Sequence, residues 1–315
     1  MKKIGKTLVI FILTVIMSTF LSACSAESKY AKEDNKLKIV VTIFPCYDFT
    51  RAVTKDEADI KMLLKPGAEN HSYEPSAQDI IDIENSDVFV YIGGESEVWV
   101  ERILENLDSD KTRTIRLIDC IDLKKEELKS GMESGNGENN GYDEHIWTSP
   151  VNAVRLVEAI KDVLIKIDTD KAEIYQTNSS LYINELALLD QDIQEIVAQG
   201  NRNVLIFGDR FPFRYFVDEY GLNYYAAFPG CATQNEASVG TIADLIDRVK
   251  KEQIPVVFYL EFSNQNIAKA ISEATGTQVL LFHSAHNISQ QDFKTGKTYL
   301  EIMRDNVNNL KEALK

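Results

Sequence analysis

Short runs of β-branched and aromatic residues alternate with stretches of helical period in both halves of this chain, and this alternation limits the fold more than any other feature. In the first half, strands are predicted at 38–44, 59–64, 87–92 and 114–118, with helices after Pro45, from Pro75 and at 97–107. In the second half, strands are predicted at 203–207, 222–226, 255–260 and 278–282, with helices at 211–219, 239–252, 264–275 and 294–313. Strand-helix alternation of this kind is typical of parallel sheets with helices on both faces. The sequence therefore predicts an α/β protein with two parallel-sheet lobes.

A long helical stretch separates the two halves. Ser149 and Pro150 provide the cap and first turn of one helix, and a second runs from about Thr169 to Gln199 with neither Gly nor Pro inside it. About 30 residues at 1.5 Å each span roughly 45 Å, which is longer than one small lobe. We expect this helix to bridge both lobes as a rigid strut. The predicted domains are an N-terminal lobe at 37–149, linking helices at 150–200 and a C-terminal lobe at 201–315.

The first 23 residues have the pattern of a secretory signal peptide. Three lysines precede an apolar run at 8–21 that is too short to span a bilayer. The run ends in Leu-Ser-Ala-Cys, and this ending resembles the lipobox of bacterial lipoproteins, in which Cys24 is lipidated. An ordinary secretory leader with an incidental cysteine is the alternative. Residues 24–36 are polar and charged and predict a lipidated tether, so we expect an extracytoplasmic protein anchored to the cell membrane.

Charge and cysteine content exclude several classes of protein. The formal net charge is −15, and it becomes −18 once the three leader lysines are removed, which excludes a nucleic-acid partner. An odd number of cysteines, Cys46, Cys120 and Cys231, remains after lipidation, so a disulfide scaffold is not expected. Residues 124–144 are rich in Lys, Glu, Gly and Asn without an apolar period, and they predict an exposed, mobile loop.

The four histidines all fall in predicted loops, mostly near strand ends, where ligands bind in parallel sheets. They are His71, His145, His283 and His286, and Asp209 lies past the strand at 203–207. Imidazole and carboxylate groups suit a borderline divalent ion, and four protein ligands without an open position describe a carrier better than a catalyst. A single loop histidine is more often a capping or hydrogen-bonding residue, but four near strand ends favour a metal site in the cleft between the lobes.

Two motifs resemble those of a known family. Pro66-Gly67 followed by His71, Tyr, Glu and Pro, and His145-Ile-Trp ahead of Pro150, are similar to the ligand motifs of substrate-binding lipoproteins of zinc and manganese ABC importers. The resemblance extends from the leader to the C-terminus. It implies His71 and His145 as the first two metal ligands, Asp209 as the third and His286 as the fourth, with His283 as a substitute for the last.

The resemblance also implies a function. The protein would capture a divalent transition metal and deliver it to an ABC permease as a monomer and without catalysis. Three imidazoles with one carboxylate favour Zn²⁺, with Mn²⁺ as the alternative. Cys231 and Cys46 are further candidates to line the cleft or to pack inertly, and Glu261 is either an acceptor that orients a ligating imidazole or a plain strand-end carboxylate.

Two other functions stay open at this point. One is a membrane-anchored zinc metallohydrolase, which would need a vacant coordination position and a general base. The sequence contains no His-Glu-x-x-His motif. The other is an adhesin-type lipoprotein in which metal binding is incidental.

Overall fold

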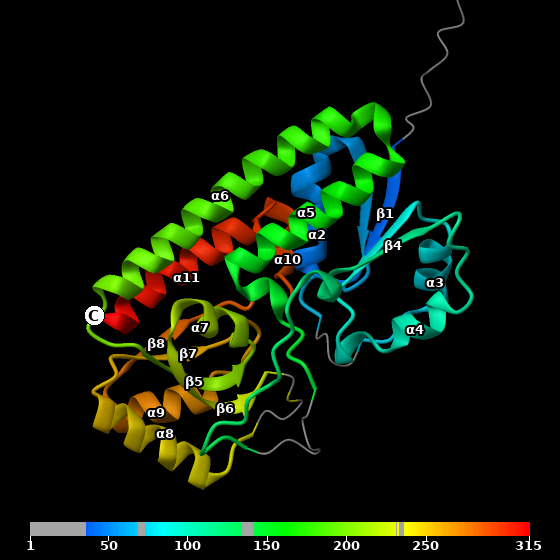
Figure 1. Ribbon diagram of the computed structural model, residues 1–315. Helices are drawn as coiled ribbons and strands as arrows, with labels where there is room; N and C mark the ends of the chain where they lie inside the picture. The colour runs from blue at the N-terminus through cyan, green and yellow to red at the C-terminus, as the bar shows by residue number, and fades with distance from the viewer. Residues whose placement is uncertain (1–35, 69–72, 134–140, 231, 233–235) are drawn as a thin grey trace, which may run out of the picture. The chain divides into compact units, whose positions relative to one another are not determined.

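The computed structural model describes residues 36–68, 73–133, 141–230, 232 and 236–315 (Figure 1). Residues 37–315 form one compact unit. The signal peptide, Cys24 and the tether lie outside the described residues, apart from Lys36. No helix in the described part of the chain is long and apolar enough to cross a bilayer.

The first lobe is built on a four-stranded parallel sheet in the order β2-β1-β3-β4. Its strands are β1 (Leu37–Val41), β2 (Ala58–Met62), β3 (Val88–Tyr91) and β4 (Arg113–Arg116), and its helices are α2 (Phe44–Thr54), α3 (Ala77–Glu84) and α4 (Trp99–Leu104). Pro45 stands in the first turn of α2 as predicted. Pro75 lies outside α3, because Ser76 caps that helix in a reciprocal pair with Asp79.

Two linking helices follow, α5 (Pro150–Ile167) and α6 (Ala172–Gln199). Ser149 caps α5 by accepting a hydrogen bond from Asn152 N. The predicted strut is therefore present, except that residues 169–171 form a short 3-10 turn before it. α6 packs against α2 and α5 on one side of the molecule and against α7 and α11 on the other, so it spans both lobes (Figure 1).

The second lobe repeats the arrangement, with a parallel sheet in the order β6-β5-β7-β8. Its strands are β5 (Val204–Phe211), β6 (Asn223–Pro229), β7 (Val256–Tyr259) and β8 (Gln278–Leu281), and its helices are α7 (Arg214–Tyr220), α8 (Val239–Glu252), α9 (Asn266–Thr275), α10 (Gln290–Thr295) and α11 (Tyr299–Leu314). The single helix predicted at 294–313 is two helices. Gly296 ends α10 with a φ of 77°, and Thr298 and Glu301 cap the start of α11.

One continuous core joins the lobes. The inner faces of both sheets, the linking helices, α2, α7 and α11 contribute to it, while α3 with α4 and α8 with α9 cover separate outer cores. Two parallel-sheet lobes joined by a long helix, as the sequence predicts, are thus confirmed. The shared core places the carboxyl ends of the strands of both lobes close to each other.

The loop predicted to be exposed at 124–144 is only partly so. Lys125 pairs with Tyr142 in an antiparallel bridge, and Tyr224 of the second lobe donates a hydrogen bond to Glu127 O at 3.3 Å. Glu133 accepts a hydrogen bond from Thr241 Oγ1 at 2.7 Å at the start of α8. Local sequence patterns could not predict these contacts, because each of these polar residues has its hydrogen-bond partner far away in the chain.

Candidate metal centre

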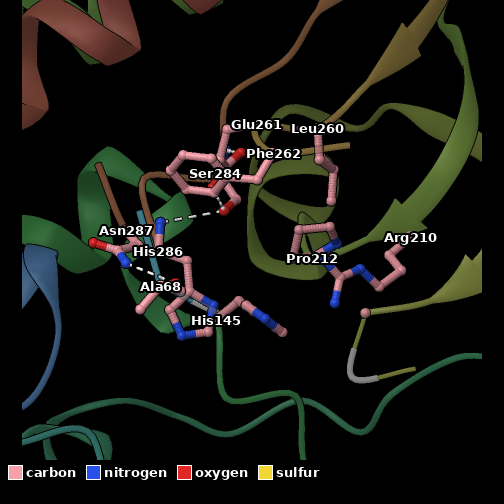
Figure 2. A pocket seen from close by; sticks show the side chains of 11 residues that line it. Ala68, His145, Arg210, Pro212, Leu260, Glu261, Phe262, Ser284, His286 and Asn287 are labelled. Carbon is pink, nitrogen blue, oxygen red and sulfur yellow. Dashed lines mark hydrogen bonds between the residues drawn. The ribbon is translucent and has the colours of Figure 1, made fainter. Parts of the chain in front are cut away.

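A small cavity lies among loops from both lobes (Figure 2). Its volume is about 40 Å³, which is room for an ion or a water molecule rather than an organic substrate. Six of its lining residues matter for its chemistry, namely His145, Arg210, Gly230, Glu261, His286 and Asn287. Ala68, which follows β2, also lines it. Strand-end loops of both lobes therefore form the cavity, as expected for a parallel-sheet protein.

His145 enters the cavity from the loop just before α5. Its imidazole is 1% exposed, and Asp143 holds it in place. The Asp143 Oδ1 atom accepts hydrogen bonds from the His145 backbone N at 2.8 Å and from Nδ1 at 2.9 Å. This contact fixes the proton on Nδ1 and leaves Nε2 as the nitrogen suited to a metal.

The charges around His145 also change its protonation. Burial lowers the pKa of the imidazole, but the charge and hydrogen bond of Asp143, together with Glu144 and Glu126, outweigh burial and raise the pKa above its ordinary value. A cation is favoured here for the same reason, because these carboxylates create a negative potential in a buried setting. The imidazole is thus a more basic ligand than an isolated one.

His286 reaches the cavity from the loop that follows β8. Its ring centroid lies 5.6 Å from that of His145, and Trp147 packs 5.1 Å from His286 and 5.4 Å from His145. The indole Nε1 donates a hydrogen bond to Ser284 O at 2.8 Å. Trp147 therefore ties the two histidine loops together, and the structure brings these two predicted ligands to one place.

His283 lies in the same loop but is engaged elsewhere. Its Nδ1 accepts a hydrogen bond from Ala285 N at 3.0 Å, and Asn306 of α11 accepts from its backbone N at 2.7 Å and donates to its carbonyl at 2.8 Å. Ala285 itself has a φ of 58°, a strained value for a residue with a side chain. His283 thus shapes the loop that presents His286 and does not line the cavity.

Glu261 follows β7 and lines the cavity. Its carboxylate accepts hydrogen bonds from Ser284 N at 2.8 Å and from Ser284 Oγ, and Oε2 lies 3.5 Å from His283 Nδ1. Ser284 Oγ in turn accepts from His286 N at 3.2 Å. Glu261 therefore acts on the His286 backbone through Ser284 and makes its imidazole contact with His283.

Asp209 is not brought to this cavity. Its carboxylate accepts hydrogen bonds from Arg210 N at 2.9 Å and Leu260 N at 3.2 Å, and it lines a separate cavity of about 190 Å³. β5 continues to Phe211 instead of ending at 207, and its pairing with β6 shifts register between Phe207 and Arg210, so Asp209 lies inside an irregular part of the strand and not in a loop at its end. Arg210, and not Asp209, lines the cavity with the histidines.

Several predicted residues fall outside the described part of the chain. His71, Cys231 and the lipidation site Cys24 are among them. Within the described residues, no three His, Cys, Asp or Glu side chains form a group that could hold a metal ion. Cys46 is buried in α2 and does not line the cavity, and burial raises the pKa of its thiol far above the ordinary value.

Two buried carboxylates behind the cavity were not anticipated. Glu97 and Glu144 are 4% and 2% exposed, and their Oε1 atoms have no hydrogen-bond partner among the described residues. Burial raises the pKa of Glu97 to about 7, with a smaller contribution from the charge of Glu144, against hydrogen bonds from Thr42 and Gly93 that lower it. The charge of Glu144 adds to the negative potential at His145.

Sequence reasoning also missed Asp143, Tyr215 and Asn287. The carboxylate two residues before His145 is a local signal that could have identified Asp143 as the group that orients the ring. Tyr215 donates a hydrogen bond to Asp143 O at 2.8 Å from α7 in the other lobe. A contact across 72 residues leaves no local trace in the sequence.

The chain is similar to proteins of known function along nearly its whole length. The ZnuA family, described as zinc-uptake complex component A, periplasmic, matches residues 39–313. The zinc-binding lipoprotein AdcA of Streptococcus pneumoniae is 33% identical over 99% of this chain, which spans only 61% of AdcA. The high-affinity zinc uptake system protein ZnuA of Bacillus subtilis is 28% identical, with 96% of this chain and 97% of that protein covered.

A solved structure shows the same likeness in three dimensions. The crystal structure of the Zn(II)-bound ZnuA-like domain of S. pneumoniae AdcA is 32% identical and has a TM-score of 0.75, with 89% of this chain and 99% of that chain covered. The shared architecture therefore includes both lobes and the helices between them.

Proposed function

The chain belongs to the ZnuA family of zinc-uptake components, and on this premise we propose that it captures Zn²⁺ outside the cytoplasm and passes it to an ABC permease. Its similarity to zinc-binding lipoproteins and to a high-affinity zinc uptake protein supports this proposal. In this role the ion is cargo and not a catalytic group, so the function is binding and release.

The pairing of His145 with His286 in a cavity of ionic size carries the proposal. The two rings come from loops far apart in the sequence, and their centroids lie 5.6 Å apart beside a cavity of about 40 Å³. Buried carboxylates near His145 favour a cation. Imidazole nitrogen is the ligand type that suits Zn²⁺, which general affinity order places well ahead of Mn²⁺ at such a site.

The proposed ligand set is His71, His145, Asp209 and His286, with Cys231 and Glu261 as alternatives to Asp209. The two backbone hydrogen bonds to the Asp209 carboxylate weaken its case. Glu261 lines the cavity. Cys231 directly follows Gly230, at which an added Cβ atom would lie 3.3 Å from His145 Cε1.

Anchoring and partners follow from the leader and the family. We propose that Cys24 carries a lipid anchor, that the mature protein is an extracytoplasmic monomer, and that a membrane permease receives the metal. Mass spectrometry of the membrane-extracted protein tests the first point, since a lipidated N-terminal cysteine adds the mass of its acyl chains and an unmodified mature chain would refute it.

Equilibrium dialysis with elemental analysis tests metal capture in the full-length protein. We expect one Zn²⁺ per chain, and loss of stoichiometric binding in His145→Ala and His286→Ala. Asp168→Asn is the control, because its carboxylate accepts a hydrogen bond from Tyr175 between the linking helices and does not line the cavity. Retained binding in both His145→Ala and His286→Ala would refute the site.

A second set of variants identifies the remaining ligand. Asp209→Ala, Cys231→Ala and Glu261→Gln each remove one candidate donor, and the true ligand is the one whose loss weakens zinc binding as strongly as loss of His145. Competition between Zn²⁺ and Mn²⁺ in the wild-type protein tests selectivity. Binding of manganese as tight as that of zinc would contradict the proposed preference.

A further inference from the structure

Asn287 connects the loop that carries His286 to a turn in the other lobe. Its Nδ2 donates hydrogen bonds to Lys65 O at 2.9 Å and to Ala68 O at 2.8 Å, and Figure 2 shows it reaching Ala68 beside the cavity. The side chain is thus shared by the two carbonyls that begin and end a four-residue turn. Asn287 itself is 3% exposed, so its amide is held by these protein partners and not by bulk water.

Backbone contacts reinforce this junction. Gly67 N donates to Ile288 O at 2.8 Å, and Phe44 N donates to His286 O at 3.4 Å. Gly67 has a φ of 80°, a conformation that glycine adopts without strain. Asn287 Oδ1 accepts a hydrogen bond from Ile288 N at 2.8 Å, which fixes the orientation of the amide. The turn after β2 and the loop after β8 therefore meet as a hydrogen-bonded unit.

We propose that Asn287 is a positioning residue for metal capture, because it sets the place of the turn that leads into His71 relative to His286. Ala68 stands three residues before His71 in the sequence and lines the cavity, so Asn287 holds the first-lobe turn at the cavity in a fixed position relative to the loop that carries His286. This inference rests on the proposed function. It assigns to Asn287 the separation between the loop that carries His286 and the first-lobe turn at the cavity.

The contribution of Asn287 is to geometry more than to folding. The residues of the turn are exposed or half-buried, so water can hydrate their carbonyls once the amide is removed. Asn287→Ala is therefore expected to fold. Partners that orient metal ligands from outside typically contribute 10- to 100-fold to metal affinity, and a loss of about 10-fold or more in zinc affinity is expected here.

Asn309→Ala is the matched control. Asn309 Nδ2 donates one hydrogen bond of 2.8 Å to Leu281 O, from α11 to the end of β8, and both residues belong to the second lobe. The control removes the same kind of side chain and the same kind of bond without touching the junction between the lobes.

Three measurements on the full-length protein test the proposal. Zinc affinity is measured by chelator competition, the ligand geometry by the visible spectrum of the Co²⁺-loaded protein, and the junction by amide hydrogen exchange at Gly67 without metal. We expect Asn287→Ala to lower zinc affinity, to change the Co²⁺ spectrum and to speed exchange at Gly67. Asn309→Ala should match the wild type in all three.

Each other outcome overturns the inference. Wild-type affinity and spectrum in Asn287→Ala, or equal losses in both variants, would show that Asn287 does not position the ligands. In that case the proposed function stands, because the wild-type protein binds zinc. If the wild-type protein itself binds no zinc, the proposed function fails and this inference fails with it, whatever happens at Gly67.

Discussion

Replacing Asp143 with Asn should weaken zinc binding and at the same time move its pH dependence to lower pH. The amide oxygen of Asn can still accept the two hydrogen bonds that Asp143 Oδ1 receives from His145, so the orientation of the ring is kept. The substitution removes the negative charge, which is the main cause of the raised pKa of His145. One variant thus separates the charge of Asp143 from its geometry.

The size of the loss in zinc affinity follows from the hydrogen bonds that Asn keeps and the negative charge that it lacks. Removing an outer partner of a metal ligand typically weakens metal binding 10- to 100-fold. Because Asn keeps the hydrogen bonds, we expect the lower end, about 10-fold, which corresponds to about 1.4 kcal/mol. Asp143→Ala leaves two buried N–H groups of His145 without acceptors, at a cost of about 1–3 kcal/mol each to folding, so it should also destabilise the protein.

The direction of the pH effect is set by the competition between a proton and the metal for His145 Nε2. In the wild-type protein the raised pKa of His145 means that zinc affinity begins to fall at a higher pH as the solution is acidified. Without the charge of Asp143, the imidazole stays neutral to a lower pH. The affinity of Asp143→Asn should therefore begin to fall at a lower pH than that of the wild type.

Zinc titrations by chelator competition between pH 5 and 8 measure both effects. Asp168→Asn is the matched control, because it makes the same change in net charge at a carboxylate that accepts a hydrogen bond from Tyr175 at 2.8 Å, between the linking helices. The control should leave affinity and pH profile unchanged. An Asp143→Asn profile that coincides with the wild type in midpoint, or that moves to higher pH, would refute the electrostatic argument.

Three further predictions concern other groups. Asp48→Ala should lower the free energy of unfolding by about 3–5 kcal/mol in urea denaturation. The buried Asp48 carboxylate pairs with Arg51 and accepts hydrogen bonds from Tyr182 of α6 and from Tyr299 N of α11. Asp168→Ala should lower the unfolding free energy by less, and an equal loss would contradict this reasoning. The chain has two tryptophans, and Trp147 is the one that packs on His145 and His286. A zinc-dependent change in tryptophan fluorescence should therefore be lost in Trp147→Phe and kept in Trp99→Phe. A zinc-dependent signal that survives in Trp147→Phe would contradict this contact. Burial raises the pKa of Glu97 to about 7, so the folded state favours its protonated form. Roughly 3 kcal/mol of folding stability that is present below about pH 4.5 should therefore be lost as the pH rises to 7. The unfolding free energy measured at both pH values should change less in Glu97→Gln than in the wild type, and an equal change would refute the assignment.

The order of elements and the approximate limits of the strands were readable from the sequence. A local run of β-branched residues indicates each strand, and a helical apolar period without Gly or Pro indicates α6. The location of His286 in the loop after β8, and of His145 just before the linking helix α5, was readable for the same reason. Such features depend on neighbours within a few residues, so the sequence by itself determines them.

The placement of Asp209 was decided only by the tertiary structure. Its local pattern suits a strand-end ligand, but pairing of β5 with β6 carries the strand on to Phe211, and the carboxylate is taken up by backbone N–H groups of Arg210 and Leu260. Sheet pairing across the chain outweighed the local signal for a strand end. Arg210 came to the cavity as a result.

The long-range hydrogen bonds that shape the metal centre likewise could not be predicted from the sequence. Asn287 holds a turn 219 to 222 residues away, Trp147 reaches a carbonyl 137 residues away, and Tyr215 reaches Asp143 across 72 residues. The sequence determined the two lobes, the strut and the histidines, because these depend on local periodicity and residue chemistry. Which groups hold the histidines in place was decided by the shared core, because packing the two lobes together is what brings those distant hydrogen-bonding partners within 3 Å.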